Sequence, residues 1–76
     1  MLLMKHKKII AISFNENEKN IKESIRVDKF NWDSMTKINL IANVDQKYKK
    51  LIDHKEFSNI KNFRDLDNLI SKTIKK

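Results

Sequence analysis

Ser34 is the residue whose position in this chain best suits covalent chemistry. It lies in the segment Asn31-Trp32-Asp33-Ser34-Met35, directly ahead of a pattern typical of an amphipathic helix. A phosphate on a hydroxyl at a helix start would lie near free backbone N–H groups and the positive end of the helix dipole. Ser and Asp are also preferred helix N-caps. The residues alone therefore leave two interpretations open, a hydroxyl that carries a phosphodiester or a plain helix cap.

Other catalytic and metal-binding motifs are absent from the composition. The chain has no Cys and no Gly, which excludes thiolate metal sites, a cysteine nucleophile and glycine-rich phosphate loops. His6 and His54 are far apart in the sequence, so we expect solvated side chains rather than a metal site. A nucleophile elbow needs glycine, and 76 residues leave little volume for a catalytic pocket. We expect a protein that is not an enzyme and holds no metal.

The elements that must position Ser34 are helices in a single domain, residues 1–76. Three main helices and one minor one are predicted, which makes a small all-α four-helix bundle. The pattern indicates helix within residues 1–14, a long loop over 15–33, helix from Ser34 to about Leu51, a short helical piece over 55–59, and helix over 63–74. The long loop should be pinned to the core by apolar anchors, and such loops are often functional.

Individual residues support these elements. Leu3, Ile10 and Phe14 share a helical face, although the β-branched run over 9–12 would also suit a short strand. Asn62 can cap the last helix, with Asp65 three residues later. The apolar stripe expected on the central helix consists of Met35, Ile38, Leu40, Ile41, Ala42, Val44 and Tyr48.

The chain carries a formal charge of +7, which raises the question of nucleic-acid binding. An A+T-rich coding sequence also produces many Lys, Asn and Ile codons, and no helix-turn-helix cue or aromatic-interleaved basic strand is present. We therefore expect no nucleic-acid partner. Apolar runs reach only four residues, far fewer than the roughly 20 that a membrane span needs, so we expect a cytoplasmic protein with no membrane span.

Several blocks of the sequence together resemble the acyl carrier proteins. Phe30-Asn31-Trp32-Asp33-Ser34-Met35 is similar to the family's Leu-Gly-x-Asp-Ser-Leu step at the start of the second helix. Val44-Asp45-Gln46-Lys47-Tyr48 resembles the end of that helix, and Asn62-Phe63-Arg64-Asp65-Leu66 resembles the capped final helix. The resemblance covers nearly the whole chain, with Ile21 as the anchor of the long loop.

This resemblance implies a carrier function. Ser34 would accept a covalent 4′-phosphopantetheine arm from coenzyme A through a phosphopantetheinyl transferase, and the arm would carry an acyl or aminoacyl group as a thioester. Asp33 would position the transferase, and Met35 would pack beneath the arm. A loading ligase and downstream biosynthetic enzymes would be the other partners. The expected partner-contact residues are Trp32, Asn39, Ala42, Asp45, Gln46, Ile52 and Phe57, with Ile52 and Phe57 bordering a cargo cleft.

Charge distinguishes this chain from the family's pattern. Carriers of bulk fatty-acid synthesis have an acidic second helix, whereas residues 34–47 here contain Lys37, Lys47 and only Asp45 as charged side chains. Asn31 stands where the family usually has glycine. This replacement is tolerable because Asn adopts positive φ more readily than most other non-glycine residues. We expect a monomeric, dedicated carrier in a specialised pathway. The alternative is a basic helical module that binds nucleic acid or a partner protein, with Asp33-Ser34 only a helix cap.

Overall fold

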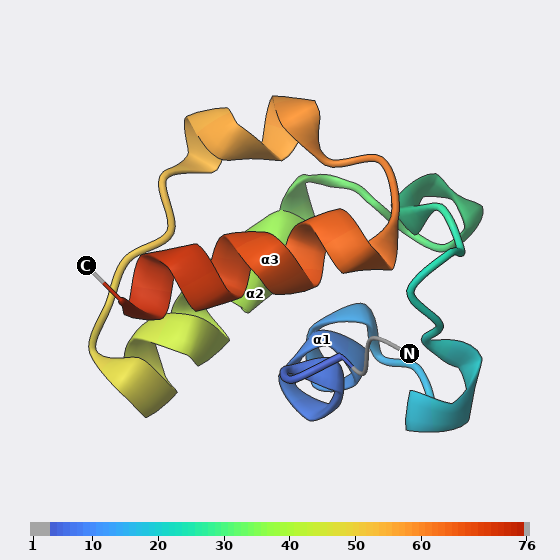
Figure 1. Ribbon diagram of the computed structural model, residues 1–76, viewed down its shortest axis with the longest axis horizontal. Coiled ribbons are helices and arrows are strands. Elements are labelled where there is room, and N and C mark those ends of the chain that lie inside the picture. The colour runs from blue at the N-terminus through green and yellow to red at the C-terminus, as the bar shows by residue number, and fades with distance from the viewer. Residues whose placement is uncertain (1–3, 76) are drawn as a thin grey trace.

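The computed structural model describes residues 4–75 and is built from helices (Figure 1). Within this range there is no strand, only an isolated bridge between Arg26 and Asn62. The all-α bundle of three main helices and one short helix is confirmed. The elements are α1 (Lys7–Phe14), the 3₁₀ helices η1 (Glu18–Asn20) and η2 (Val27–Lys29), α2 (Ser34–Tyr48), the 3₁₀ helix η3 (His54–Asn59) and α3 (Phe63–Ile74).

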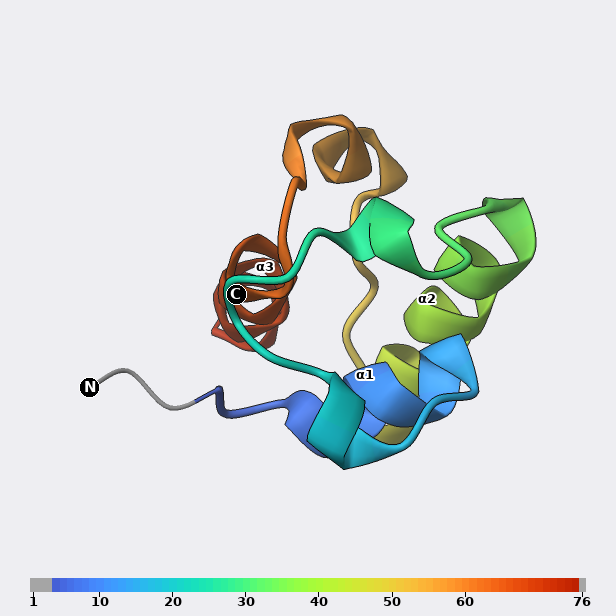
Figure 2. The ribbon, with the colours of Figure 1, turned by 90° about the vertical axis from the view of Figure 1, so that its right-hand side faces the viewer.

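The helices surround one apolar core. Helix α1 packs chiefly on α2, while η3 lies over α2 and α3 at the opposite end of the bundle (Figure 2). None of the helices between residues 4 and 75 has the length and apolar character needed to cross a membrane. The buried apolar side chains are Ile9, Ile10, Ala11, Phe14, Ile21, Val27, Leu40, Val44, Ile52, Phe57, Phe63, Leu66, Leu69 and Ile70.

Helix α1 is short because left-handed backbone ends it. Asn15 has φ 56° and ψ 45°, and its N–H bonds back to the carbonyls of Ala11 and Ile12. Residues 9–12, which would also suit a strand, are helical, while the predicted contribution of Leu3 lies outside the described residues. Ser13 then links α1 to α2, since its Oγ donates to the Ile9 carbonyl at 2.8 Å and accepts from Asn43 Nδ2 at 2.9 Å.

The buried face of α2 differs from the predicted one. Thr36, Leu40 and Val44 point into the core, whereas Met35 is 66% exposed and Ile38 is 60% exposed. Two sets of side chains on this helix share a face, and the set at four-residue intervals, Thr36, Leu40 and Val44, is the one that packs inward. The Met35 face therefore remains available at the surface.

Helix α2 also ends earlier than predicted. Lys49 takes up left-handed backbone with φ 60° and ψ 36°, and its N–H donates to the Asp45 carbonyl at 2.8 Å. Left-handed backbone at the end of a helix usually occurs at Gly or Asn, and position 49 is a lysine. The sequence therefore does not indicate where the helix ends. The helix therefore closes at Tyr48, and Leu51 lies in the following loop.

The long loop is tied to the start of α3, as its apolar anchors predict. Ile21 and Val27 are buried in the core. The Val27 N–H donates to the Lys61 carbonyl, and the Phe63 N–H donates to the Ile25 carbonyl, both at 3.0 Å. The predicted cap of α3 is confirmed as a reciprocal pair: Asn62 Oδ1 accepts from the Asp65 N–H at 3.0 Å, and the Asp65 carboxylate accepts from the Asn62 N–H. These contacts hold the loop that leads into α2.

His6 is not solvated as expected but helps fasten the N-terminal segment to α3. Its Nε2 lies 3.0 Å from Ser71 Oγ, and its backbone N–H donates to the buried Asp67 carboxylate at 2.7 Å. Its ring meets the Tyr48 ring edge-on. Among the described residues, Nδ1 is buried without a hydrogen-bond partner. Burial lowers the pKa of His6, Asp67 opposes this shift, and Lys47 and Lys5 reinforce it.

We expect acidification to weaken the fold through His6. Because its folded-state pKa lies below the ordinary value of about 6.5, the unfolded chain binds the proton more readily. The associated stability is complete above about pH 6.5 and is lost as the pH falls through the lower folded-state pKa. Urea unfolding at pH 7.5 and 5.5 should show a drop that is smaller in His6→Gln. His54→Gln, which changes an exposed histidine, is the matched control, and an equal drop in all three proteins would contradict this role.

Candidate functional site

Asp33, and not Ser34, caps helix α2. Asp33 Oδ1 accepts a hydrogen bond from the Thr36 N–H at 2.9 Å. Hydrogen bonds from Thr36, the backbone one foremost, lower the pKa of the Asp33 carboxyl and keep it an ionised acceptor at neutral pH. Ser34 is the first helical residue and is exposed. Its hydroxyl has no hydrogen-bond partner among residues 4–75, so it is not needed for capping.

Ser34 stands at a cavity of about 520 Å³ between α2 and η3. That volume is within the range of small-molecule sites and about twice that of two other surface hollows, which measure about 240 and 250 Å³. Its walls combine apolar side chains with hydroxyl and basic groups, and no carboxylate lines it. The lining residues are Ser34, Lys37, Ile38, Ile41, His54, Phe57 and Ser58.

Trp32 forms an aromatic support next to this cavity. Its ring stacks on Phe14 with centroids 5.6 Å apart and meets Phe57 edge-on at 5.3 Å. The ammonium of Lys37 lies over the Trp32 ring, 5.1 Å from its centroid. Trp32 is partly buried against the core, so it joins α1, α2 and η3 at the site rather than forming a cavity wall.

The predicted contact residues lie in three different environments. Met35, Asn39, Ala42, Asp45 and Gln46 are all exposed along α2, and Met35, Asn39, Ala42 and Gln46 succeed one another at intervals of four, three and four residues. Phe57 lines the cavity although it is only 4% exposed. Ile52 is different: it is 5% exposed, belongs to the core and is not among the cavity's lining residues. The expectation that Ile52 borders the cleft is therefore corrected, because the chain turns inward at that position after α2.

The sequence prediction missed most of the cavity lining. Lys37, Ile38 and Ile41 follow Ser34 at intervals of three, four and seven residues, which is the spacing of one helical face. That spacing could have identified them. The residues contributed by η3, His54 and Ser58, could not have been found in this way because they approach from another element.

The structure also gives the backbone conformation of Asn31 and the positions of the two histidines. Positive φ occurs among the described non-glycine residues at Asn15 and Lys49, so Asn31 does not use the left-handed backbone invoked for it. Between residues 4 and 75, no group of three His, Cys, Asp or Glu side chains could hold a metal ion. His54 stands at the cavity, and His6 lies in the contact with α3.

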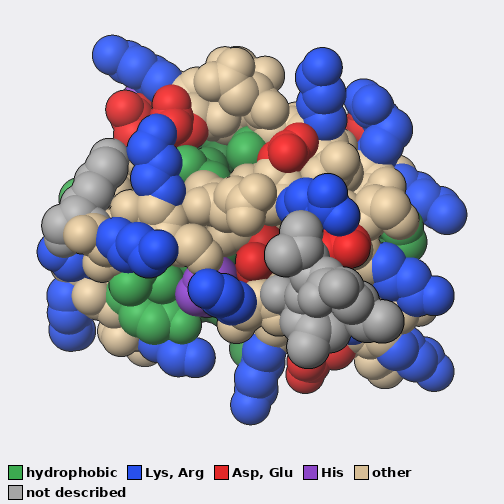
Figure 3. Space-filling view, in the orientation of Figure 1, with side chains coloured by type: hydrophobic (Ala, Val, Ile, Leu, Met, Phe, Trp, Pro, Cys, Tyr) green, Lys and Arg blue, Asp and Glu red, His purple; other side chains and the backbone are tan. Residues whose placement is uncertain are grey.

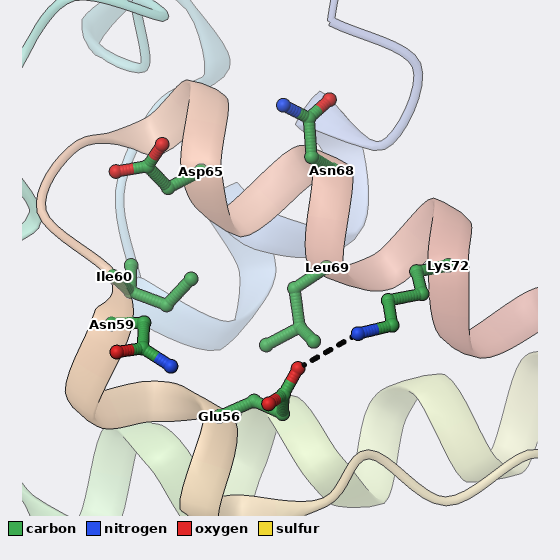
Figure 4. A pocket seen from close by; sticks show the side chains of 7 residues that line it. All are labelled: Glu56, Asn59, Ile60, Asp65, Asn68, Leu69 and Lys72. Atoms are coloured by element: carbon green, nitrogen blue, oxygen red, sulfur yellow. Dashed lines mark hydrogen bonds and ion pairs between the residues drawn. The ribbon is translucent and has the colours of Figure 1, made fainter.

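A second hollow lies between η3 and α3, and its charged side chains are paired with one another or with the backbone (Figure 4). Glu56 and Lys72 form an ion pair across it at 3.1 Å. Its Asp65 carboxylate already accepts from the Lys61 N–H at 3.0 Å and takes part in the cap of α3. Its remaining lining residues are Asn59, Ile60, Asn68 and Leu69, and none of the seven is a nucleophile of the Ser34 kind.

The basic charge is spread over the surface. On the face shown in Figure 3, Lys and Arg side chains project on all sides, with acidic side chains between them. Such a distribution lacks the single continuous patch or stripe that marks a nucleic-acid interface. The charge therefore identifies no nucleic-acid site on this face.

Of the comparisons with known proteins, the one with solved structures found a similar fold. No protein-family model matches the chain, and no curated protein matches it by sequence. Among solved structures, it is similar to the solution NMR structure of holo acyl carrier protein from Geobacter metallireducens, with 24% sequence identity and a TM-score of 0.70. The match covers 91% of this chain and 80% of that one. The chain therefore has the fold of an acyl carrier protein.

Proposed function

We propose that this protein is an acyl or aminoacyl carrier that bears a 4′-phosphopantetheine arm on Ser34. The observation that carries this proposal is the exposed Ser34 hydroxyl at the first residue of α2, released from capping by Asp33. The acyl-carrier fold and its holo structural neighbour support the same function. A hydroxyl that served only as a cap would be occupied by a backbone N–H.

The residues around Ser34 fit such an arm. In loading, Ser34 Oγ would bond to phosphorus as the bond from that phosphorus to the nucleotide half of coenzyme A breaks, and the serine proton would pass to the departing adenosine 3′,5′-bisphosphate. The attached phosphodiester would lie near the unpaired N–H groups of the first turn of α2. Met35 supplies exposed apolar surface next to it, and Asp33 presents a carboxylate to the transferase. When bound, the arm supplies a thiol that holds cargo as a thioester.

The exposed side of α2 is the proposed contact surface for partner enzymes. Asn39, Ala42, Asp45 and Gln46 follow Ser34 along this side. With Lys37 and Lys47 against the single acid Asp45, helix α2 has a net charge of +1. Enzymes that recognise an acidic helix would lose electrostatic complementarity here. We infer a dedicated carrier, loaded by its own ligase and serving a small set of enzymes in a specialised pathway.

Loading with coenzyme A tests this function directly. After incubation with a broad-specificity phosphopantetheinyl transferase, intact-mass measurement should show the gain of one arm. Cleavage after lysine releases residues 30–37, in which Ser34 and Thr36 are the hydroxyl residues, and fragmentation should place the added mass on Ser34. A known carrier loaded in parallel controls for transferase activity. No gain under these conditions would contradict the carrier function and favour a basic binding module.

A further inference from the structure

Lys37 is a cation placed where helix electrostatics disfavour one. It is the fourth residue of α2, and the first turn of this helix holds no acidic residue. The N-terminal end of a helix carries partial positive charge, which repels a nearby ammonium and attracts an anion. Residues that break such a local rule are often explained by function. A negative charge bound near Ser34 would reverse the electrostatic disadvantage of this lysine.

Within residues 4–75, no carboxylate pairs directly with the Lys37 ammonium. Lys37 forms no ion pair with any acidic side chain in the part of the chain that the structure describes. The ionised carboxylate of Asp33, four residues before Lys37, accepts from the Thr36 N–H and forms no ion pair with the lysine. Instead, the Lys37 ammonium lies over the face of Trp32, 5.1 Å from its centroid. An aromatic ring is uncharged, so it does not neutralise the ammonium beside the helix N-terminus as a phosphate would.

Lys37 is also close enough to Ser34 to meet a group attached there. Residues three positions apart on a helix are surface neighbours, with Cβ atoms about 5–6 Å apart. Both side chains line the same cavity. Lys37 is half-buried, and its ammonium lies over Trp32 next to the cavity that the lysine lines.

We propose that Lys37 is a positioning residue that pairs with the phosphodiester on Ser34 and directs the arm into the cavity between α2 and η3. This inference rests on the proposed function. In the loaded protein the Lys37 ammonium shifts from the Trp32 face toward the phosphate oxygens. The arm then runs past Ile38, Ile41 and Phe57, which supply the apolar walls.

The test compares apo and loaded forms of the whole chain, free of cargo, in the wild type, Lys37→Gln, Lys37→Arg and Lys47→Gln. Lys47 is the matched control because its ammonium also lies over an aromatic ring, that of Tyr48 at 5.4 Å, but at the far end of α2. Loading should raise the wild-type melting temperature at low salt by a few degrees, up to about 4 °C, because the gain of one exposed ion pair is partly offset by the lost contact with Trp32. The rise should shrink in 0.5 M NaCl, since salt screens exposed charges.

Lys37→Gln should lose at least half of this rise, while Lys37→Arg and Lys47→Gln should keep it. If Lys37 only covered Trp32, the glutamine variant would lose equal stability in both forms, and the rise on loading would be unchanged. An unchanged or absent rise, or one that does not respond to salt, would overturn the role of Lys37. Trp32 is the sole tryptophan, so its emission should also shift on loading in the wild type more than in Lys37→Gln. Failure to load at all would instead overturn the carrier function.

Discussion

Ser34→Ala is expected to abolish attachment of the phosphopantetheine arm completely while leaving the fold intact. The substitution removes the only side-chain atom that the proposal makes the acceptor, so no mass gain should remain. Stability should change by less than about 0.5 kcal/mol, because Ser34 is exposed and Asp33 supplies the cap. If Ser34 itself capped α2, the loss would be about 1 kcal/mol. Intact-mass measurement and urea unfolding check the two expectations separately.

Ser58→Ala is the matched control for this variant. Ser58 lines the same cavity from η3, so its replacement alters a hydroxyl at the site without touching the start of α2. It should load as the wild type does. Loading of Ser34→Ala to the wild-type extent would show that another hydroxyl accepts the arm and would refute the assignment of Ser34.

Phe63→Ala is expected to have the largest effect on stability, a loss of about 3–5 kcal/mol. Phe63 is fully buried at the first residue of α3. Its ring meets Phe14 edge-on at 5.1 Å and lies 5.8 Å from that of Phe30. Removing it leaves a cavity where the long loop, α1 and α3 meet. Each kcal/mol lost lowers the melting temperature of a domain of this size by about 4–8 °C, so the melting temperature should fall by roughly 15–30 °C. The loss is a large part of the total stability of a small domain, about 5–15 kcal/mol.

Urea unfolding followed by circular dichroism measures this loss. The control is Leu51→Ala, an apolar truncation at a side chain that is 69% exposed, which should change stability by about 0.5 kcal/mol or less. A loss below about 1 kcal/mol for Phe63→Ala would contradict its place in the core. Phe63 does not line the cavity beside Ser34, so the folded fraction of the variant should load as the wild type does.

The carrier hypothesis explains why this small domain keeps an exposed apolar side on α2. Met35 and Ile38 remain at the surface beside Ser34 and the cavity. In a domain with few apolar residues, leaving two large ones exposed forgoes burial that would stabilise the fold. If the protein is such a carrier, the arm and partner enzymes would contact that surface, and the net charge of +1 on α2 would favour enzymes that do not require an acidic helix.

Local sequence signals were sufficient to predict the three main helices and the place of Ser34 at the start of α2, but not where α2 ends. Asn62 and Asp65 mark the start of α3 because a reciprocal cap needs only residues three positions apart. Asp33 marks the start of α2 in a similar way, since its side chain accepts from the N–H of Thr36, three positions later. All of these depend on interactions between near neighbours, which a single sequence contains.

Contacts between distant segments decided the rest. Helix α2 has two apolar faces, and only packing against α1 and α3 determines that Thr36, Leu40 and Val44 turn inward while Met35 stays outside. The cavity beside Ser34 exists because η3 folds back over α2, which brings His54 and Ser58 to it and leaves Ile52 in the core. Periodicity states which residues share a face, but it contains no information on which face another element will cover. The sequence by itself determined the helices and the serine at the head of α2, and the tertiary structure decided what surrounds that serine.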